Sequence, residues 1–272
     1  MIPAGTIPNV LTIAGTDPSG GAGIQADLKA FSALGAYGTT VITALVAQNT
    51  RGVEAVELVS PAFVTRQIDC LLADVRIDAV KIGMLATAEI VRAVAGALRR
   101  HGLTRVVVDP VMVAKSGDRL LRQDAVAALR EEILPLAALV TPNLPEAADL
   151  LDRPAAARRA EMPETAAALL ALGPRAVLLK GGHLEDEAES PDLLLGPAGA
   201  ITLTAPRIAT RNTHGTGCTL SAAIAALLPQ RPDLETAVRE AKSYLTGALQ
   251  ASGRLSVGDG HGPLHHFHRW WG

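Results

Sequence analysis

The stretch "AVKIGMLATAEIVRAVAGALRRHGLTRVVVDPV", residues 79–111, decides the fold class of this chain. Two short apolar runs, 79–84 and 105–111, enclose a longer Ala/Leu-rich run at 87–101. Strands that are apolar throughout are typical of a sheet that is covered on both faces. The stretch therefore predicts a strand–helix–strand unit with parallel strands.

The same alternation extends outward in both directions along the chain. Further strands are predicted at 10–15, 38–48, 53–59, 138–143, 176–182, 192–196 and 200–205. Further helices are predicted at 21–35, 61–73, 122–133, 144–151, 163–172, 215–229 and 233–251. Only "PAG" separates the last two strands, which predicts a hairpin. No low-complexity linker divides the pattern, so we expect a single α/β domain over residues 1–272 with a mostly parallel sheet.

Composition excludes several classes of protein. The chain has 272 residues, 49% of them hydrophobic, which is enough for a large core. A net charge of -2 gives no general attraction to nucleic acid or to an anionic membrane. No apolar run reaches the roughly 18 residues of a membrane span. The two cysteines, Cys70 and Cys218, make neither a disulfide framework nor a zinc pattern, and we expect a reduced, cytoplasmic protein. Cys70 lies beside Leu71 and Leu72 in a predicted helix, and we expect it to pack in the core.

The segments that follow the predicted strands are rich in Gly, Asp, Asn, Glu, Lys and Thr. In open α/β sheets, ligands bind beyond the carboxyl ends of the strands. Any one of these residues also suits an ordinary turn. Seven such segments at one predicted edge favour a binding site for phosphate, magnesium and hydroxyl groups.

The segment "NTHGTGC", 212–218, opens an Ala-rich helix. The first amides of a helix lack partners inside it, and the helix dipole favours anions there. Gly215, Thr216 and Gly217 could therefore hold a phosphoryl group. Cys218 could be a buried structural cysteine, or a reactive one whose thiol pKa is lowered by the start of the helix.

Other charged residues follow predicted strands in "DPV" (109–111), "TPNLPE" (141–146) and "LLKGG" (178–182). Asp109, Asn143 and Glu146 could hold magnesium, which prefers one or two carboxylates together with phosphates. Asp109 could equally cap a helix or turn, and Glu146 could be a first-turn acid that the helix dipole favours. Lys180 could bind a phosphate or could be a solvated lysine at the end of a strand.

The segment 15–23, "GTDPSGGAG", is either a flexible surface loop or a loop that folds over a small substrate, with Asp27 pointing back toward it. The nearby "GAGIQA" matches a dinucleotide fingerprint formally. We reject that interpretation because the turn after the strand is too long and no ribose-binding acid ends the next strand.

Taken together, the motifs of residues 9–268 resemble the bacterial hydroxymethylpyrimidine/phosphomethylpyrimidine kinases of thiamine biosynthesis, a family of the ribokinase-like superfamily. The resemblance rests on "TIAGTDPSGGAGIQADLKAF", "GTTVITALVAQNT", "VKIGML", "VVVDPVM", "TPNLPEA", "LLKGGH", "NTHGTGCTLSAAIAA" and "GHGPLHHF". The related pyridoxal kinases usually have Asp where this chain has Cys218.

The resemblance implies a three-layer α/β/α ribokinase-like fold without a separate lid domain, and a homodimer. It implies phosphorylation of 4-amino-5-hydroxymethyl-2-methylpyrimidine, and then of its monophosphate, with ATP and Mg²⁺. Neither nucleic acid nor membrane is an expected partner. The pyrimidine site implied by the resemblance is lined by Asp27, Gln48 and Met84, with Gly15 and Val111 nearby.

The resemblance also assigns the transfer site. Cys218 takes the catalytic position, beside the anion hole of the loop with Gly215, Thr216 and Gly217. ATP is assigned to Asn143, Lys180, Thr216 and Gly217, and Mg²⁺ to Asp109 and Glu146. We hypothesise that a Cys218 thiolate accepts the hydroxyl proton. A pyridoxal kinase and a non-catalytic pyrimidine-binding protein are the alternatives.

Overall fold

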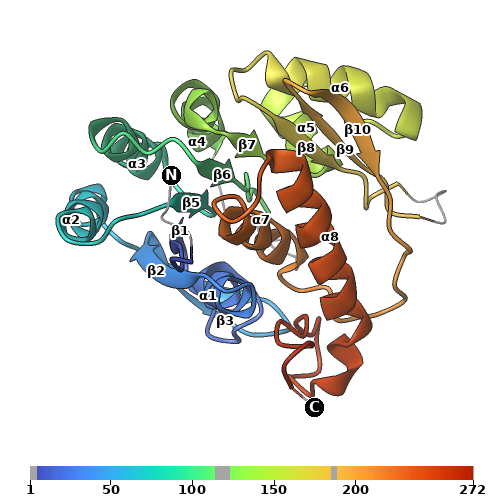
Figure 1. Cartoon of the computed structure of the whole chain (residues 1–272). Coiled ribbons are helices and arrows are strands. Elements are labelled where there is room, and N and C mark those ends of the chain that lie inside the picture. The colour runs from blue at the N-terminus through green and yellow to red at the C-terminus, as the bar shows by residue number, and fades with distance from the viewer. Residues whose placement is uncertain (1–4, 114–122, 185–188, 272) are drawn as a thin grey trace.

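The computed structural model describes residues 5–113, 123–184 and 189–271. In these residues, one eight-stranded sheet has the strand order β10-β9-β8-β7-β6-β5-β1-β2 (Figure 1). Its strands are β1 (Asn9–Ala14), β2 (Tyr37–Ile42), β5 (Ala79–Ile82), β6 (Val106–Val108), β7 (Leu139–Val140), β8 (Val177–Lys180), β9 (Asp192–Gly196) and β10 (Gly199–Leu203). In this order the six strands β8, β7, β6, β5, β1 and β2 pair in parallel with their neighbours, and β9 is antiparallel to both β8 and β10. The mostly parallel sheet and the β9–β10 hairpin are thus confirmed.

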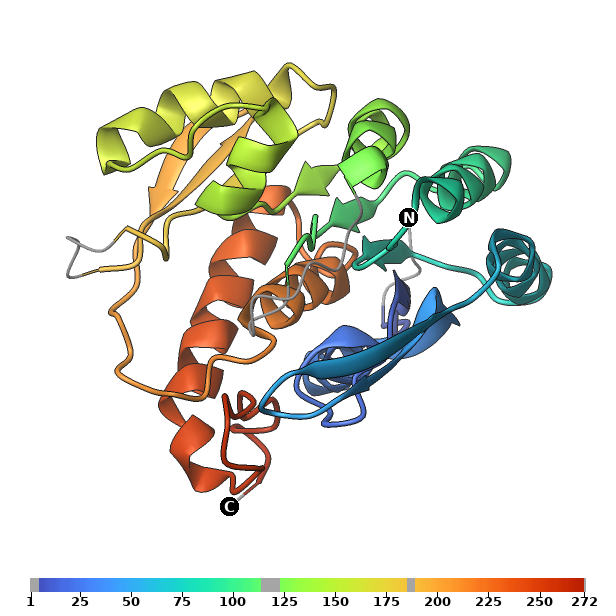
Figure 2. The same ribbon diagram turned by 180° about the vertical axis from the view of Figure 1, so that it is seen from behind.

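Helices cover both faces of this sheet (Figures 1 and 2). They are α1 (Gly23–Ala33), α2 (Pro61–Leu72), α3 (Ala88–Arg100), α4 (Gln123–Ala128), α5 (Leu144–Leu151), α6 (Met162–Leu170), α7 (Thr216–Leu227) and α8 (Leu234–Gln250). Leu11 and Ile13 of β1 pack with α2 to α6, whereas Val10 packs with α1, α7 and α8. Side chains alternate between faces along a strand, so the two faces support separate cores. The three-layer α/β/α fold is confirmed.

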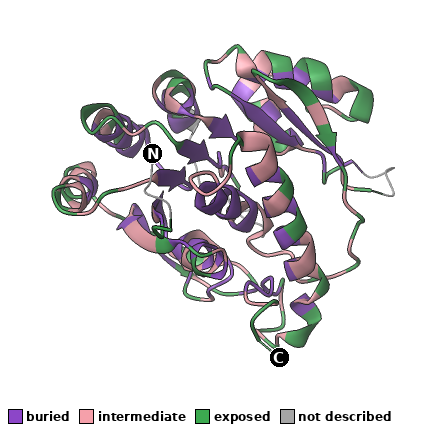
Figure 3. Ribbon diagram, in the orientation of Figure 1, coloured by how far each residue is buried: buried purple, intermediate pink, exposed green. Residues whose placement is uncertain are grey.

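Helix α7 is the most deeply placed element of its layer (Figure 3). Every residue from Thr219 to Leu227 is buried, and most of them are small. Small side chains allow the helix to lie close against the middle of the sheet. The body of α7 is therefore packed against the sheet, and its first residues, Thr216 to Cys218, are partly exposed at the carboxyl edge of the strands.

The predicted strand 38–48 is wrong as a single element. It divides at Thr43 into β2 and β3 (Ala44–Gln48), and β3 forms a separate antiparallel two-stranded sheet with β4 (Val53–Leu58). The buried Thr43 donates its hydroxyl to the carbonyl of Met84 and its amide to that of Ala14. These bonds turn the chain away from the sheet edge, and the β3–β4 hairpin extends past α1 (Figure 2).

Two local predictions also need correction. The predicted helix 122–133 is α4 followed by a π-helical turn, Leu129–Ile133, and a 3₁₀ turn that contains Pro135; position 122 lies outside the described residues. Cys70 was predicted to pack in the core, yet it is exposed. Helix α2 buries only Val64 and Ile68, so Cys70 is on its outer face.

Within the ranges given above, none of the helices combines the length and the apolar character that a bilayer span requires.

Candidate active site

The carboxyl ends of the parallel strands bring the predicted site segments to one edge of the sheet. Gly15 follows β1, Met84 lies two residues after β5, Asp109 follows β6, Asn143 lies three residues after β7, and Lys180 ends β8. An additional parallel bridge joins Asn143 to Lys180. The prediction that these segments meet at one edge is therefore confirmed.

The start of α7 lies at the same edge and leaves amides open to a ligand. Gly215 precedes the helix with φ of 78°, a left-handed conformation that favours glycine. No side chain caps the amides of the first turn. A helix start of this kind, held by a buried helix, has the chemistry of an anion site.

A cluster of one lysine and two carboxylates lies directly below this helix start. The Lys180 ammonium is 3.0 Å from Asp109 Oδ1 and 3.7 Å from Glu146 Oε2. A Cβ added to Gly217 would lie 3.3 Å from both Lys180 Nζ and Asp109 Oδ2, so Gly217 contacts the cluster. The Lys180 side chain is only 14% exposed, which contradicts the alternative of a solvated strand-end lysine.

Glu146 has two roles in this cluster. It forms a capping box with Asn143: each residue accepts the backbone N–H of the other, at 2.7 and 2.8 Å. Burial and the Asp109 charge raise the pKa of Glu146 to about 7, although Lys180 opposes the rise. An added cation beside this carboxyl group would favour its carboxylate form.

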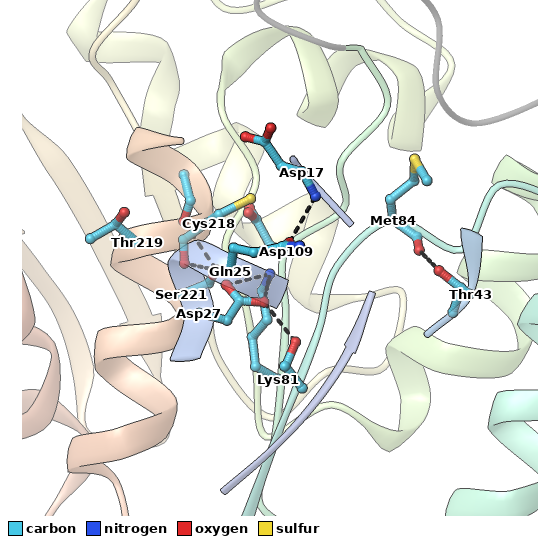
Figure 4. Close-up of polar contacts among 12 residues, drawn as sticks. Asp17, Gln25, Asp27, Thr43, Lys81, Met84, Asp109, Cys218, Thr219 and Ser221 are labelled. Atoms are coloured by element: carbon cyan, nitrogen blue, oxygen red, sulfur yellow. Dashed lines mark hydrogen bonds and ion pairs between the residues drawn. The ribbon is translucent and has the colours of Figure 1, made fainter. Parts of the chain in front are cut away.

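A second lysine–aspartate pair, which the sequence analysis missed, lies beneath the site. Lys81 Nζ binds both oxygens of Asp27 at 3.0 and 2.8 Å, and the Thr12 hydroxyl donates to Asp27 at 2.6 Å (Figure 4). Both charged side chains are 0% exposed. Burial lowers the pKa of Lys81, but the Asp27 carboxylate raises it further, so the lysine stays charged. The sequence feature that could have indicated this pair is the single lysine, Lys81, inside the apolar run "AVKIGM".

This pair bears on the role predicted for Asp27. Its carboxylate is directed to Lys81 and Thr12, and the residue is completely buried. The pair contributes a fixed charge distribution below Cys218, and contact between Asp27 and a substrate stays a prediction.

Cys218 lies near Asp109 and the Lys81–Asp27 pair (Figure 4), and its surroundings do not favour a thiolate. Burial raises the pKa of its thiol to about 11, and the charges of Asp27 and Asp109 add to the rise. Lys81 and the Gly23 amide act in the opposite direction but do not offset it. The expected lowering of this pKa by the helix start is wrong, because burial and two nearby carboxylates outweigh the helix dipole.

On the other side of Cys218, an apolar group surrounds Gly15. A Cβ at Gly15 would lie 2.6 Å from the terminal methyl of Met84, and Ala44 and Val46 of β3 complete the contact. Gln48 ends β3 and is partly exposed. Within the described residues, the side-chain amide of Gln48 has no hydrogen-bond partner. Val111 lies two residues after Asp109 and is partly exposed.

The residues present suit magnesium only in company with a phosphate. No group of three potential metal-binding side chains occurs in the part of the chain that the structure describes. Asp109 and Glu146 supply two carboxylates that both approach Lys180. Two carboxylates plus phosphate oxygens and water are the usual environment of magnesium at a phosphate-transfer site.

The fold and this edge define a class: a phosphotransferase of the ribokinase-like fold that acts on a small molecule. A sequence model described as phosphomethylpyrimidine kinase matches residues 17–265. The chain is 62% identical over 263 residues to the hydroxymethylpyrimidine/phosphomethylpyrimidine kinase of Escherichia coli, covering 97% of this chain and 98% of that protein. The chain belongs to the phosphomethylpyrimidine kinase family.

Solved structures agree with this assignment. A phosphomethylpyrimidine kinase from Clostridium difficile superposes with a TM-score of 0.79 at 41% identity, over 89% of this chain and 99% of that one. An ADP complex of Bacillus subtilis pyridoxal kinase has a TM-score of 0.88 at 36% identity, over 96% and 98% of the two chains. The fold is therefore shared with a kinase that is named for pyridoxal.

Proposed function

We propose that the protein transfers the γ-phosphoryl group of ATP to the hydroxymethyl group of 4-amino-5-hydroxymethyl-2-methylpyrimidine, and then phosphorylates the monophosphate to the diphosphate. The observation that carries the proposal is the position of Cys218. It follows Gly217 at an uncapped helix start, with the Lys180 cluster on one side and the Gly15–Met84 group on the other. The relatives named for this reaction support the choice of substrate.

The chain supplies the parts that phosphoryl transfer needs. We assign the start of α7 at Thr216 and Gly217 to the phosphoryl oxygens, where charge accumulates in a loose transition state. The Gly217 amide would donate to them directly, whereas the Thr216 amide donates to the Thr213 carbonyl at 3.3 Å. Lys180 places a fixed positive charge beside them. Mg²⁺, held by Asp109 and Glu146, would neutralise charge on the phosphate oxygens. Asn143 fixes Glu146 through the capping box. It lies at the same edge of the sheet, where we assign it to ATP.

The alcohol is positioned from the other side. The Gln48 amide offers both a donor and an acceptor to the amino-pyrimidine edge. Met84, Gly15 and Val111 give the ring an apolar surface. Because burial raises the thiol pKa of Cys218 to about 11, we assign it to the reacting oxygen as a neutral thiol and a weak hydrogen-bonding group. In a loose transition state the hydroxyl proton leaves late, which makes a strong base at this position unnecessary.

The test is a coupled assay of ADP release with the hydroxymethylpyrimidine, with pyridoxine, and without any alcohol. We expect the highest kcat/KM with the pyrimidine, and mass spectrometry should detect its monophosphate and then its diphosphate. A higher kcat/KM for pyridoxine would instead assign the protein to the pyridoxal kinases. Gln48→Met should raise the KM for the pyrimidine by about tenfold or more, because the amino-pyrimidine edge of the bound substrate would lose its hydrogen-bond partner. The exposed Gln250 provides the control, Gln250→Met, with an unchanged KM.

Three finer assignments belong to the same proposal. We infer a single domain, because one eight-stranded sheet carries a helical layer on each face and each layer packs against strands along the sheet. The protein is a homodimer in solution, which light scattering tests directly. We also propose a cytoplasmic location, which cell fractionation tests.

A further inference from the structure

The segment 15–23 is folded around the carboxylate of Asp17. The residue is 0% exposed. Its oxygens accept hydrogen bonds from the amides of Ser19, Gly21 and Ala22, at 2.7 to 3.1 Å, and from the Ser19 hydroxyl at 2.7 Å. The Ile24 amide donates to the Gly15 carbonyl and closes the segment at its base. The segment is therefore an ordered loop with its own polar centre.

One further donor to Asp17 comes from the far end of the chain. His214 Nε2 lies 2.7 Å from Asp17 Oδ2, across 197 positions of sequence. Burial raises the pKa of Asp17, but the hydrogen bonds from His214 and Ser19 more than offset this effect and hold the pKa well below its usual range. The carboxylate is thus ionised, and His214 donates to it.

The backbones of the two loops touch at the same place. A Cβ on Gly21 would collide with the His214 ring, and a Cβ on Gly215 would collide with the Gly21 carbonyl. Gly215 immediately precedes the helix-start amides assigned to the phosphoryl group. The position of the loop 15–23 therefore sets the position of those amides.

The other side of the loop 15–23 reaches the surface assigned to the alcohol. The Thr16 amide donates to the Ala44 carbonyl, and the Val46 amide donates to the Thr16 hydroxyl, both at 3.0 Å. These bonds join the loop to β3, which ends at Gln48. Gly15 at the base of the loop contacts Met84. One loop thus connects the alcohol side with the phosphoryl side.

We propose that the Asp17–His214 hydrogen bond aligns the alcohol with the γ-phosphoryl group by fixing the loop 15–23 against the start of α7. His214 is in this sense a positioning residue, not a catalytic one. The inference rests on the proposed function, since it assumes transfer to an alcohol. Breaking the bond moves the two halves of the site apart and admits water to the phosphoryl group.

The test compares three variants at His214. His214→Leu removes the donor, His214→Asn is too short to reach Asp17, and His214→Gln can present an N–H at a reach similar to that of Nε2. We expect kcat for alcohol phosphorylation to fall about 100-fold in the Leu and Asn variants, because a misplacement of about 1 Å costs that much. The KM for ATP should change less than about twofold, and the Gln variant should recover most of kcat.

The decisive readout is the ratio of ADP formed to alcohol phosphorylated. The wild-type ratio should be one, and it should rise clearly above one in the Leu and Asn variants, because water then competes for the phosphoryl group. A merely structural role would lower the amount of active protein without changing this ratio. Arg51→Ala is the matched control: its exposed ion pair with Asp259 also joins distant segments, and it should leave the ratio at one.

Three results would overturn the inference: a ratio of one in both variants that lack the donor, an unchanged kcat, or an equal loss of kcat in the Gln variant. If the Leu variant does not fold, the comparison of Asn with Gln decides alone. The alcohol in this assay is the one that the wild-type protein phosphorylates best, so an error in the proposed substrate is detected separately, in the wild-type protein.

Discussion

Two lysine–aspartate pairs lie near Cys218, with their lysines on strands β5 and β8 of the same sheet, and they differ in exposure and in the number of carboxylates. Lys81 and Asp27 are both 0% exposed and satisfy each other with the help of Thr12. Lys180 and Asp109 are joined by a second carboxylate, Glu146, and the lysine is partly exposed. We call the first pair closed, because its two charges balance and neither side chain is exposed to solvent. The second has surplus negative charge and an open side, which is what a site for a magnesium–phosphate complex requires.

The largest expected effect comes from opening the closed pair. Lys81→Met leaves the Asp27 carboxylate buried without its cation, and the free energy of unfolding should fall by about 3–5 kcal/mol. Urea unfolding followed by circular dichroism measures this loss. The double variant Lys81→Met with Asp27→Leu should recover part of it, because no charge is then left unpaired. A loss of unfolding free energy below about 1 kcal/mol in the single variant would mean that Asp27 does not depend on Lys81 for its charge balance.

The corresponding change in the open cluster should affect catalysis more than stability. Lys180→Met removes the positive charge beside the phosphoryl site, and we expect kcat to fall by about 10²- to 10³-fold. Its unfolding free energy should fall less than that of Lys81→Met, because water can reach the cluster. Steady-state kinetics and urea unfolding of the two variants check the contrast, with the exposed Arg239→Ala as control. Equal losses of stability would remove the distinction.

The surplus charge of the open cluster predicts a pH dependence of stability. The pKa of Glu146 is raised from 4.5 to about 7, so the folded protein binds more protons than the unfolded chain between these values. Unfolding free energy therefore decreases as the pH rises through this range, by up to about 1.4 kcal/mol per pH unit from this residue. In magnesium-free buffer, Glu146→Gln should abolish this contribution, and an unchanged slope in the variant would contradict the raised pKa.

The smallest effect is expected at Cys218, which lies between the two pairs. With a thiol pKa of about 11, roughly one molecule in 10⁴ carries a thiolate at pH 7. Cys218→Ala should therefore lower kcat by less than about tenfold, and Cys218→Ser should be close to the wild type. A loss of 10²-fold or more in the Ala variant, the range typical of a general base, would restore the thiolate hypothesis.

Much of the fold follows from local patterns in the sequence. The apolar strand runs and Ala/Leu-rich helices of residues 79–111 predict parallel strand–helix units, and the "PAG" turn predicts the β9–β10 hairpin. The division at Thr43 could not be predicted from its run of β-branched residues, because a tertiary hydrogen bond to Met84 causes it.

The site divides in the same way. Placement after strands brought Asp109, Lys180 and Gly217 together correctly, since the ends of parallel strands meet at one edge. The basic partners of Asp17 and Asp27, His214 and Lys81, are 197 and 54 positions away, and no local pattern indicates them. The pKa of Cys218 depends on the same distant charges, so the helix start alone gave the wrong direction.

The segment 258–266 closes the molecule against parts that were made first. Gly258 and Gly260 lie against Thr50 so closely that neither has room for a Cβ, and the His261 amide donates to the Thr50 carbonyl. His266 meets Thr219, the residue after Cys218. The segment 258–266 therefore joins the turn after β3 to the helix that carries Cys218, so one stretch near the end of the chain contacts both the alcohol side and the phosphoryl side of the proposed site.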